Sequence, residues 1–546
     1  MPYDRFVLDR LPPREQWPRW LDNLPVPVAG QSVNAIDALW ARAEQAGWMD
    51  RPLLRSEQEV LNYAQTRERA ARLAAVLTGP LGLQPGQRVL LRGPNSIALA
   101  VAWLAVVQAG LVSVCTMPLL RAKELGDIID KSQPAIALCD ARLLEELQLA
   151  QASHPALRQV LSWGASGETD ALARWLEDAS VQTRPPHPDL GLAADMPDDP
   201  IALLAFTSGT TGSPKAAVHT HRDLLAACEA WPRHVLQARP DDIVMGSPPL
   251  AFTFGLGGLL LFPLWAGASV YYPDGAYTPA RMVELMAQVG CTLCYTAPTF
   301  YRQMAPLIQQ HPVPSLRISV SAGEALPDAT RQLWKQASGL EMLDGIGATE
   351  MFHIFISAAG ADVRPGAIGK VVPGYQARVV DEQGQELPRG TVGRLAVIGP
   401  TGCRYLSDPR QTNYVRQGWN YPGDTFMQDE DGYFYYQARD DDMIITAGYN
   451  VGGPEVEDAL LQHPAVAECG VVAKPDVERG MIVKAYCVLR AGHAASPELV
   501  KALQDHVKTH LAPYKYPREI EFMAHLPRTE TGKLQRFRLR QLAQQG

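Results

Sequence analysis

The segment Thr207-Ser-Gly-Thr-Thr-Gly-Ser-Pro-Lys215 gathers hydroxyl and glycine residues into a short stretch that ends in a lysine. Glycine lets the backbone approach a ligand closely, and successive N–H groups and hydroxyls can then surround an anion. The segment is not a Walker A loop, because Gly209 and Gly212 are too close together and Ala216 follows the lysine. The pattern favours a polyphosphate site, with a chance loop of small residues as the alternative.

The sequence around this segment predicts an α/β fold. Residues 200–206 are an apolar run typical of a buried strand. Residues 217–231 are expected to form a helix, with Thr220 and Asp223 at capping-box spacing. Strand and helix patterns alternate from residue 87 to 117, which predicts parallel strands covered by helices. The expected core is therefore a set of layered sheets and helices.

The C-terminal part of the chain predicts two further units. Residues 376–398 read as a small β region with a Gly/Pro-rich turn. Beyond residues 439–443, helix and strand patterns form a compact α+β unit large enough for its own core. We therefore expect a large N-terminal domain over 1–440 and a small C-terminal domain over 441–546.

Composition limits the class of protein. The chain has 546 residues, a formal net charge of −8 and eight cysteines. The negative charge argues against a nucleic-acid partner. So few cysteines in so long a chain indicate a reduced, cytoplasmic setting, and Cys291 and Cys294 are expected in the core. The charged N-terminus lacks the apolar core of a signal peptide.

Two uncharged stretches, 95–120 and 247–273, exceed the ~18 residues that suggest a membrane span. Glycine or proline interrupts both stretches. Continuous apolar runs are also what a parallel sheet covered on both faces requires. We therefore expect buried core and no membrane span.

Other segments follow the first one in a fixed order. They are Ser321-Ala-Gly-Glu-Ala-Leu326, Asp344-Gly-Ile-Gly-Ala-Thr-Glu350, Tyr421-Pro-Gly-Asp-Thr425, Ala438-Arg-Asp-Asp-Asp-Met-Ile444 and Pro527-Arg-Thr-Glu-Thr-Gly-Lys533. The ordered set resembles the motifs of the adenylate-forming superfamily, which contains acyl-CoA synthetases, adenylation domains of peptide synthetases and beetle luciferases. The resemblance covers almost the whole chain.

The resemblance implies a two-step reaction and a mobile C-terminal domain. A carboxylate attacks the α-phosphorus of MgATP, giving an acyl-adenylate and pyrophosphate; a thiol such as that of coenzyme A then displaces AMP. Nucleotide-binding residues implied by the resemblance are Thr207, Ser208, Gly209, Thr210, Thr211, Gly212 and Lys215 at the β- and γ-phosphates, Gly323, Glu324 and Ala325 along the adenine, Asp344, Gly345 and Ile346 in the next loop, and Asp424 and Arg439 at the ribose.

Four residues are implied to act during the reaction or between its steps. Thr349 would bind the α-phosphate and Glu350 would help to hold Mg²⁺. Lys533 would bridge the carboxylate and the α-phosphate, and Asp441 would serve as the hinge. Structural alternatives remain for three of these residues and for Asp424: Glu350 as a helix cap, Asp424 as part of a Pro-Gly turn, Asp441 as a solvated turn, and Lys533 as one of several neighbouring basic residues.

The segments expected to line the acyl pocket suggest an aromatic acid. Phe252, Phe254 and Phe352 suggest a flat apolar slot, and glycines 255, 257, 345 and 347 are expected to leave room for a ring. Phenylalanine is more often plain core. The run Thr349-Glu-Met-Phe-His-Ile-Phe355 resembles the benzoate–CoA ligase branch, and Phe252-Thr-Phe-Gly-Leu-Gly257 resembles 2-aminobenzoate–CoA ligases. Substrate-pocket residues are therefore expected to be Phe252, Phe254, Gly347, His353 and Ile354.

The sequence thus predicts an aryl-acid–CoA ligase that uses ATP, Mg²⁺ and coenzyme A, acts on 2-aminobenzoate or benzoate, and is compatible with an oligomer. His353 could accept a hydrogen bond from an ortho amine while neutral, or it could be an ordinary core histidine. The alternatives are an enzyme that loads a carrier protein, a medium-chain acyl-CoA synthetase, and a non-catalytic nucleotide-binding protein.

Overall fold

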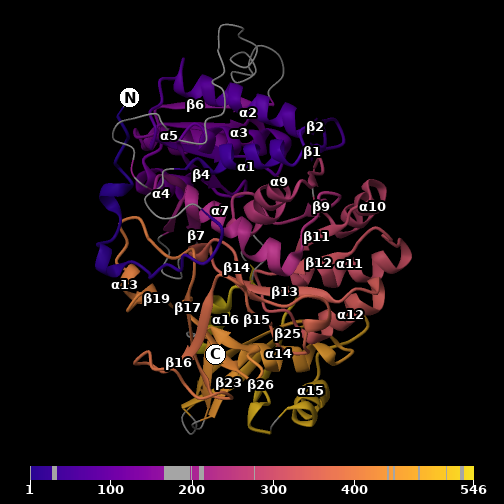
Figure 1. Cartoon of the computed structure of the whole chain (residues 1–546). Coiled ribbons are helices and arrows are strands. Elements are labelled where there is room, and N and C mark those ends of the chain that lie inside the picture. The colour runs from indigo at the N-terminus through magenta and orange to yellow at the C-terminus, as the bar shows by residue number, and fades with distance from the viewer. Residues whose placement is uncertain are drawn as a thin grey trace.

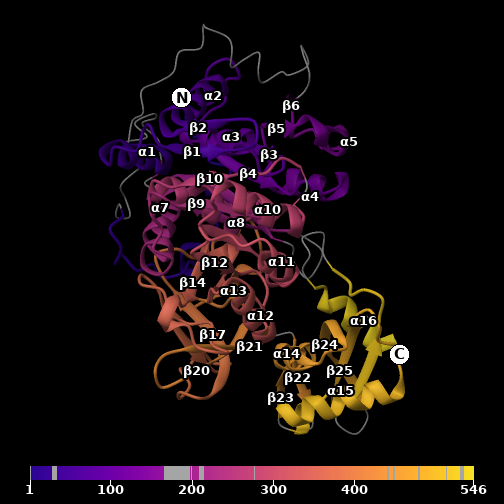
Figure 2. The ribbon, with the colours of Figure 1, turned by 90° about the vertical axis from the view of Figure 1, so that its right-hand side faces the viewer.

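A computed structural model describes residues 2–26, 33–164, 197, 199–207, 214–275, 277–439, 442–446, 449–476, 480–511, 513–528 and 534–545. Three sheets and their helices make up the larger N-terminal part. The C-terminal part lies at the opposite end of the molecule from the sheet that contains β3 (Arg88–Arg92) to β6 (Gln159–Trp163) (Figures 1 and 2). The layered α/β fold predicted from the sequence is confirmed.

One six-stranded sheet carries the Thr207–Lys215 segment. Its strand order is β6-β5-β3-β4-β7-β8, and all neighbours are parallel except β7 and β8. Its strands are β3 (Arg88–Arg92), β4 (Val112–Thr116), β5 (Ile136–Asp140), β6 (Gln159–Trp163), β7 (Ile201–Thr207) and β8 (Lys215–Thr220).

Helices cover both faces of this sheet because its strands are apolar on both sides. Val89 and Leu91 point into the core that holds α1 (Ala35–Gln45), α2 (Tyr63–Thr78) and α3 (Ile97–Gln108). Leu90, between them, packs in a second core with helices α4 (Ala122–Ser132) and α5 (Leu144–Ser153). The alternation along β3 thus places the sheet between two helical layers.

A nine-stranded sheet forms the second half of the N-terminal part. Its order is β15-β14-β13-β12-β11-β9-β10-β1-β2, with a parallel centre from β1 to β13. Its strands are β1 (Pro52–Arg55), β2 (Val60–Asn62), β9 (Ile243–Gly246), β10 (Ser269–Tyr271), β11 (Leu293–Thr296), β12 (Ile318–Ser321), β13 (Met342–Gly347), β14 (Ile354–Ser357) and β15 (Lys370–Val371).

Helices α10 (Pro279–Val289), α11 (Pro298–Gln310) and α12 (Asp328–Ser338) pack on one face of this sheet. Buried residues of α7 (His221–Glu229), α8 (Thr253–Leu256) and α9 (Phe262–Ala266) belong to the large core on its other side. The two uncharged stretches lie in this core, as predicted, and no described helix is long and apolar enough to cross a membrane. Cys291 and Cys294 are buried, as expected.

The remaining sheets are smaller. One consists of β16 (Gln376–Val380), β17 (Val392–Ile398), β18 (Val415–Arg416), β19 (Trp419–Asn420), β20 (Asp424–Gln428) and β21 (Phe434–Arg439), with α13 (Gln411–Tyr414) beside it. The C-terminal part contains β22 (Met443–Thr446), β23 (Tyr449–Gly452), α14 (Gly453–Gln462), β24 (Val466–Asp476), β25 (Gly480–Leu489), α15 (Pro497–His510), β26 (Glu519–Phe522) and α16 (Arg536–Gln545). Short 3₁₀ or π turns are Leu8–Arg10, Arg14–Gln16, Ala141–Leu143, Pro232–Leu236, Gly257–Leu261, Thr349–Met351, Gly360–Asp362 and Pro513–Lys515.

The C-terminal part has its own hydrophobic core, which includes Ile444, Val471 and Leu503. It contacts the N-terminal part where Asp458 of α14 accepts a hydrogen bond from the backbone N–H of Ala329, at 3.2 Å. The boundary between residues 440 and 441 stays a prediction, because both residues lie outside the described ranges.

One predicted helix boundary was wrong. Residues 217–220 belong to β8, which pairs antiparallel with β7, and α7 begins only at His221. Ala217 pairs with Ala205 of the buried strand β7, and the Val218 N–H donates to the Arg404 carbonyl at 2.8 Å on the other side of β8. These tertiary contacts outweigh the helix propensity of the two residues. The predicted capping box is confirmed, since Thr220 and Asp223 bond reciprocally across the first turn. The glycine-rich segment therefore joins two strands, not a strand and a helix.

Candidate active site

The predicted site segments follow the carboxyl ends of neighbouring parallel strands. In register, Gly246 pairs with Tyr295, Thr296 with Ser321, and Ser321 with Asp344. The acyl-pocket segment, the adenine segment and the loop with Thr349 and Glu350 therefore all follow the carboxyl ends of strands in the nine-stranded sheet. Open parallel sheets bind ligands at the carboxyl ends of their strands.

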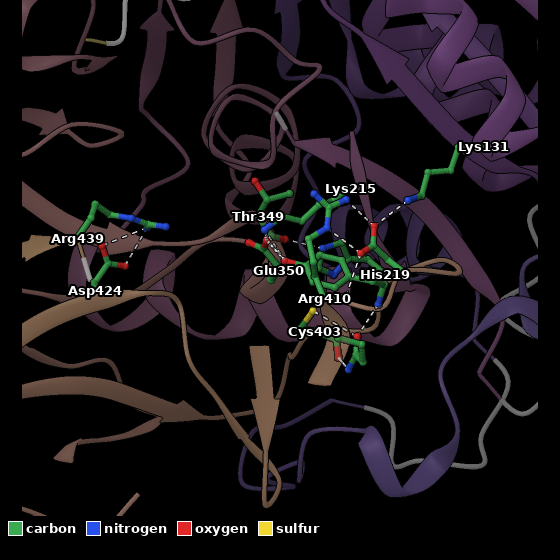
Figure 3. Close-up of polar contacts among 12 residues, drawn as sticks. Lys131, Lys215, His219, Thr349, Glu350, Cys403, Arg410, Asp424 and Arg439 are labelled. Carbon is green, nitrogen blue, oxygen red and sulfur yellow. Dashed lines mark hydrogen bonds and ion pairs between the residues drawn. The ribbon is translucent and has the colours of Figure 1, made fainter. Parts of the chain in front are cut away.

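Glu350 lies at the centre of a polar cluster that joins three elements (Figure 3). Its carboxylate is buried in the turn Thr349–Met351 and accepts a hydrogen bond from the Tyr405 hydroxyl. Nζ of Lys215, the first residue of β8, lies 3.3 Å from the same hydroxyl and 4.0 Å from Oε1 of Glu350. The cluster thus brings the lysine that ends the glycine-rich segment next to the Thr-Glu turn.

Tyr405 is neutral in this cluster. Burial raises the pKa of Tyr405 far above its ordinary value, and the adjacent Glu350 carboxylate adds to the effect. A protonated hydroxyl can donate to the carboxylate, and this bond fixes one oxygen of Glu350. Lys215 and Glu350 therefore both contact the Tyr405 hydroxyl, which fixes the distance between them.

The residues around Glu350 fit a magnesium ion of the kind that accompanies a nucleotide. Among the described residues, no group of three or more His, Cys, Asp or Glu side chains could hold a metal by itself. Magnesium is commonly bound through one or two carboxylates, with substrate phosphates and waters as the other ligands. A single buried carboxylate beside the glycine-rich segment suits that mode.

Asp424 and Arg439 form a cross-strand ion pair. Asp424 begins β20 and lies directly opposite Arg439 at the end of β21. Nη1 of Arg439 is 3.2 and 3.3 Å from the two carboxylate oxygens. Figure 3 shows this pair apart from the Glu350 cluster. The pairing holds the buried carboxylate of Asp424 in one orientation, so its predicted ribose-binding role is geometrically compatible with a pre-positioned acceptor.

The predicted adenine segment contains a left-handed turn. Gly323 has φ of +91° and is exposed, a conformation that glycine adopts without strain. Beside it, the Glu324 carboxylate accepts a hydrogen bond from Thr299 at 3.4 Å, and Ala325 is exposed. Ile346 was expected in a loop but lies in β13, where it pairs with Ile356 of β14 and is half-buried against the core. An exposed turn next to an apolar side chain is a surface on which a base could lie.

Asp344, expected in a loop, is a buried acid within β13. Its Oδ1 accepts the N–H of Gly345 at 2.9 Å, and Arg331 lies 3.7 Å away. Burial raises its pKa to about 6, although Arg331 opposes the shift. Ionising Asp344 therefore costs more free energy in the folded protein than in the unfolded chain, because the buried carboxylate has lost its hydration.

Replacing Asp344 with Asn is expected to stabilise the protein at pH 8 by up to about 3 kcal/mol. The folded pKa lies above the unfolded value of 3.8. The folded state therefore binds more protons between these values, and stability falls as the pH rises from about 4 to 6. The thermal midpoint of Asp344→Asn should exceed that of the wild type at pH 8, and this gap should narrow by pH 4.5.

The exposed Asp362 provides the matched control, since Asp362→Asn should shift the midpoint equally little at both pH values. A gap for Asp344→Asn that is the same at pH 4.5 and pH 8 would contradict the buried-charge explanation.

His353 lies in an aromatic cluster. Its ring centroid is 4.6 Å from that of Phe262, 5.2 Å from Trp231 and 5.6 Å from Phe254. Burial lowers the pKa of His353 to about 3, so the imidazole is neutral at physiological pH. The backbone of Phe254 opposes this shift, but neither ring nitrogen has a hydrogen bond of acceptable geometry among the described residues. A buried polar ring with unused bonding capacity can accept or donate a hydrogen bond to a ligand.

Two features of the predicted slot need correction. Phe352 is fully buried and packs edge-on against His219 at 5.4 Å, so it belongs to the core. The glycines do not leave open space, because the chain itself fills the volume beside them. An added Cβ would lie 2.1 Å from the Pro249 carbonyl at Gly255, 2.7 Å from the His353 ring at Gly257, 2.7 Å from the Ile354 side chain at Gly345, and 2.6 Å from the His353 carbonyl at Gly347.

Among the other predicted pocket residues, Phe252 and Phe254 are half-buried and Ile354 is buried against Gly345. Thr207 and Lys215 are directly paired across the β7–β8 hairpin. Several predicted residues lie outside the described ranges: Ser208, Gly209, Thr210, Thr211, Gly212, Asp441 and Lys533.

Sequence reasoning missed two residues that contact the Thr349–Glu350 turn. Tyr405 bonds Glu350 from a segment with no local motif. His219 donates to the Thr349 carbonyl at 2.7 Å from within β8. The histidine stands four residues after Lys215, and correct assignment of β8 as a strand would have placed both side chains on one face.

The sequence matches the family described as "AMP-binding enzyme" over residues 40–404 and "AMP-binding enzyme C-terminal domain" over residues 455–533. It is 36% identical over 515 residues to the benzoate–CoA ligase of Thauera aromatica, covering 93% of this chain and 96% of the relative. The crystal structure of the anthranilate CoA ligase AuaEII with anthranoyl-AMP superposes with a TM-score of 0.86 at 33% identity, over 94% of this chain and 98% of that one.

A benzoate CoA ligase from Burkholderia xenovorans LB400 is also similar, with a TM-score of 0.81 and 31% identity over 93% of this chain and 99% of that one. The motif order, the layered fold and these matches agree with one another. The chain therefore belongs to the AMP-binding, adenylate-forming enzymes, within the part of that family that contains the aryl-acid and acyl–CoA ligases.

Proposed function

We propose that this protein is an ATP-dependent aryl-acid–CoA ligase that acts on 2-aminobenzoate or benzoate. The observation that carries the aryl assignment is the neutral His353 ring, buried among Phe254, Phe262 and Trp231, whose nitrogens have no hydrogen bond of acceptable geometry within the described part of the chain. Apolar rings around one uncommitted polar group suit a planar acid with a polar substituent. The benzoate and anthranilate ligases that the chain resembles support the same substrate class.

In the proposed first half-reaction, the substrate carboxylate attacks the α-phosphorus of ATP. An acyl–phosphate bond forms while the bond to pyrophosphate breaks. The nucleophile is already an anion near neutral pH, so no general base is needed. The main obstacle is the approach of an anion to a polyanion, and fixed positive charge lowers that barrier.

The described residues can supply part of that environment. Lys215 would place its charge at the phosphates, and Thr349 would bond the α-phosphate. Glu350, held by Tyr405, would contribute the protein ligand to Mg²⁺, which supplies charge neutralisation when bound. Asp424, already oriented by Arg439, would accept the ribose hydroxyls.

In the proposed second half-reaction, a thiolate attacks the acyl carbon and AMP leaves. The C-terminal domain would rotate about Asp441 between the two steps, because the steps need different catalytic surfaces. Release of pyrophosphate with a panel of benzoate, 2-aminobenzoate and octanoate tests the proposal, followed by addition of either CoA or a carrier protein. Transfer to the carrier protein alone, octanoate as the best acid, or no pyrophosphate with any acid would each favour one alternative.

Replacing His353 with Ala is expected to reduce the preference for 2-aminobenzoate over benzoate. If the neutral imidazole accepts a hydrogen bond from the ortho amine, its loss leaves that amine without a partner. The change in the ratio of kcat/KM for the two acids should correspond to about 1–3 kcal/mol. Both acids should be measured with both proteins, which cancels any general loss of folded enzyme.

His221 offers the matched control, because it is also a buried histidine but bonds the backbone N–H of Ala35 at 3.1 Å. His221→Ala should leave the ratio between the acids unchanged even if total activity falls. An unchanged ratio in His353→Ala would remove His353 from amine recognition.

A further inference from the structure

Buried side chains hold the turn that carries Thr349 and Glu350 through hydrogen bonds to its carbonyl groups. We propose that His219 is a positioning residue for adenylate formation. It holds the turn through the Thr349 carbonyl, in the position from which Thr349 would bind the α-phosphate and Glu350 would bind Mg²⁺. The inference rests on the proposed function for the identity of the reaction. It concerns a residue outside the glycine-rich segment and outside every motif quoted above.

The geometry of His219 allows one direction of bonding. The side chain is fully buried, and its Nε2 lies 2.7 Å from the Thr349 carbonyl oxygen. A carbonyl only accepts, so Nε2 carries a proton and donates it. The other ring nitrogen faces Asp223 at 3.8 Å, and Asp223 is itself bound by Arg404 at 2.6 Å. The imidazole is thus held between a fixed carboxylate and the turn.

The turn needs such support because its backbone is strained. Phe352, directly after the turn, has φ of +70°, a region that non-glycine residues rarely adopt. Its ring packs edge-on against the His219 ring, with centroids 5.4 Å apart. The Met351 carbonyl accepts a second buried hydrogen bond, from the Thr401 hydroxyl at 2.7 Å. Two buried donors and one aromatic contact therefore maintain a conformation that the local sequence disfavours.

His219 also sets the turn relative to Lys215. The two residues lie four positions apart in β8, so their side chains leave the same face of the strand. Strand β8 therefore contacts the turn twice: Lys215, at the start of the strand, lies near Glu350, and His219, near its end, bonds the Thr349 carbonyl. If the histidine bond is lost, the strained turn can relax and carry Thr349 and Glu350 away from the phosphates. A displacement of about 1 Å can lower a rate roughly 10²-fold.

The test compares His219→Leu, which fills similar space without a donor, with His219→Gln, whose terminal amide can donate from a similar position. Pyrophosphate formation reports the first half-reaction, with whichever acid the wild type accepts. Thioester formation from synthetic acyl-adenylate reports the second. We expect His219→Leu to lower kcat of the first half-reaction about 10- to 100-fold, with a smaller change in KM for ATP. The rate of the second half-reaction should change little, and His219→Gln should recover most of the lost rate of the first.

His221→Gln is the matched control, since it alters another fully buried histidine two residues away, whose Nδ1 accepts a hydrogen bond from the backbone of Ala35. It should lower both half-reactions equally, in proportion to the folded fraction. The same equal loss in His219→Leu, or a Gln variant no better than Leu, would overturn the positioning role.

If His219→Leu does not fold, Thr401→Val takes its place, because it removes the donor to the other carbonyl of the turn. A selective loss of the first half-reaction supports the proposal, and unchanged kinetics overturn it. Failure of the aryl-acid assignment would appear separately, as a wild-type preference for octanoate, while the selective effect of His219→Leu on pyrophosphate formation would persist with that acid.

Discussion

Replacing Lys533 with Ala is expected to slow adenylate formation by at least about 10²–10³-fold while sparing thioester formation from a pre-made acyl-adenylate. In the first half-reaction two anions approach, and the resemblance places this lysine between the carboxylate and the α-phosphate. A positioned cation contributes most where charge builds up in the transition state. The second half-reaction starts from an adenylate in which that repulsion has already been overcome.

The measurement is single-turnover pyrophosphate release, followed separately by thioester formation from synthetic adenylate. Arg528 is the matched control, because it is a basic residue of the same motif that pairs with Glu468 at 2.6 Å. Arg528→Ala should cost about 1 kcal/mol of stability or less and leave the ratio of the two steps unchanged. Equal losses of both steps in Lys533→Ala would show that the lysine is structural.

Asp441→Pro is expected to abolish most thioester formation while adenylate formation persists. Proline restricts φ to about −65° and removes a backbone donor, so it prevents the backbone rotation that a hinge must perform. Adenylate formation needs only one domain orientation, whereas the full reaction needs two. Single-turnover release of pyrophosphate should therefore remain near the wild-type rate as acyl-CoA formation collapses.

Asp441→Ala is the control, since it removes the carboxylate but keeps the freedom of the backbone. It should retain both steps within about tenfold, because a hinge acts through its backbone and this change leaves the backbone free to rotate. If Asp441→Pro forms the thioester at the wild-type rate, the residue is an ordinary turn residue and the hinge lies elsewhere.

The strands of the core could be predicted because burial leaves a local signal. The run Ile201–Thr207 and the runs around Val89 and Val112 are apolar at consecutive positions, as strands covered on both faces must be. The start of α7 was also predictable in principle, since Thr220 and Asp223 form their capping box within four residues. Residues 217–220 were misassigned because they pair with β7 and, through Val218, with the Arg404 carbonyl, contacts that helix propensity does not include.

The acyl pocket shows the same limit. Glycines 255, 257, 345 and 347 suggested space for a ligand, yet each makes room for the chain's own atoms. Phe352 suggested a slot wall and instead packs behind the Thr-Glu turn. The sequence does not show whether a glycine or phenylalanine lines a ligand pocket or packs in the core. The residues that surround it in the folded protein decide which of the two it does.

The sequence by itself determined the α/β class, the order of the nucleotide motifs, and the membership in the AMP-binding enzymes, because each rests on residues close together in the chain. Only the tertiary structure decided that Tyr405 bonds Glu350 beside Lys215, that His219 holds the Thr349 carbonyl, and that His353 sits neutral among aromatic rings. Tyr405 and Lys215 are 190 residues apart and His219 and Thr349 are 130 apart. Contacts over such separations depend on how sheets and helices pack as a whole, and no local pattern of residues encodes them.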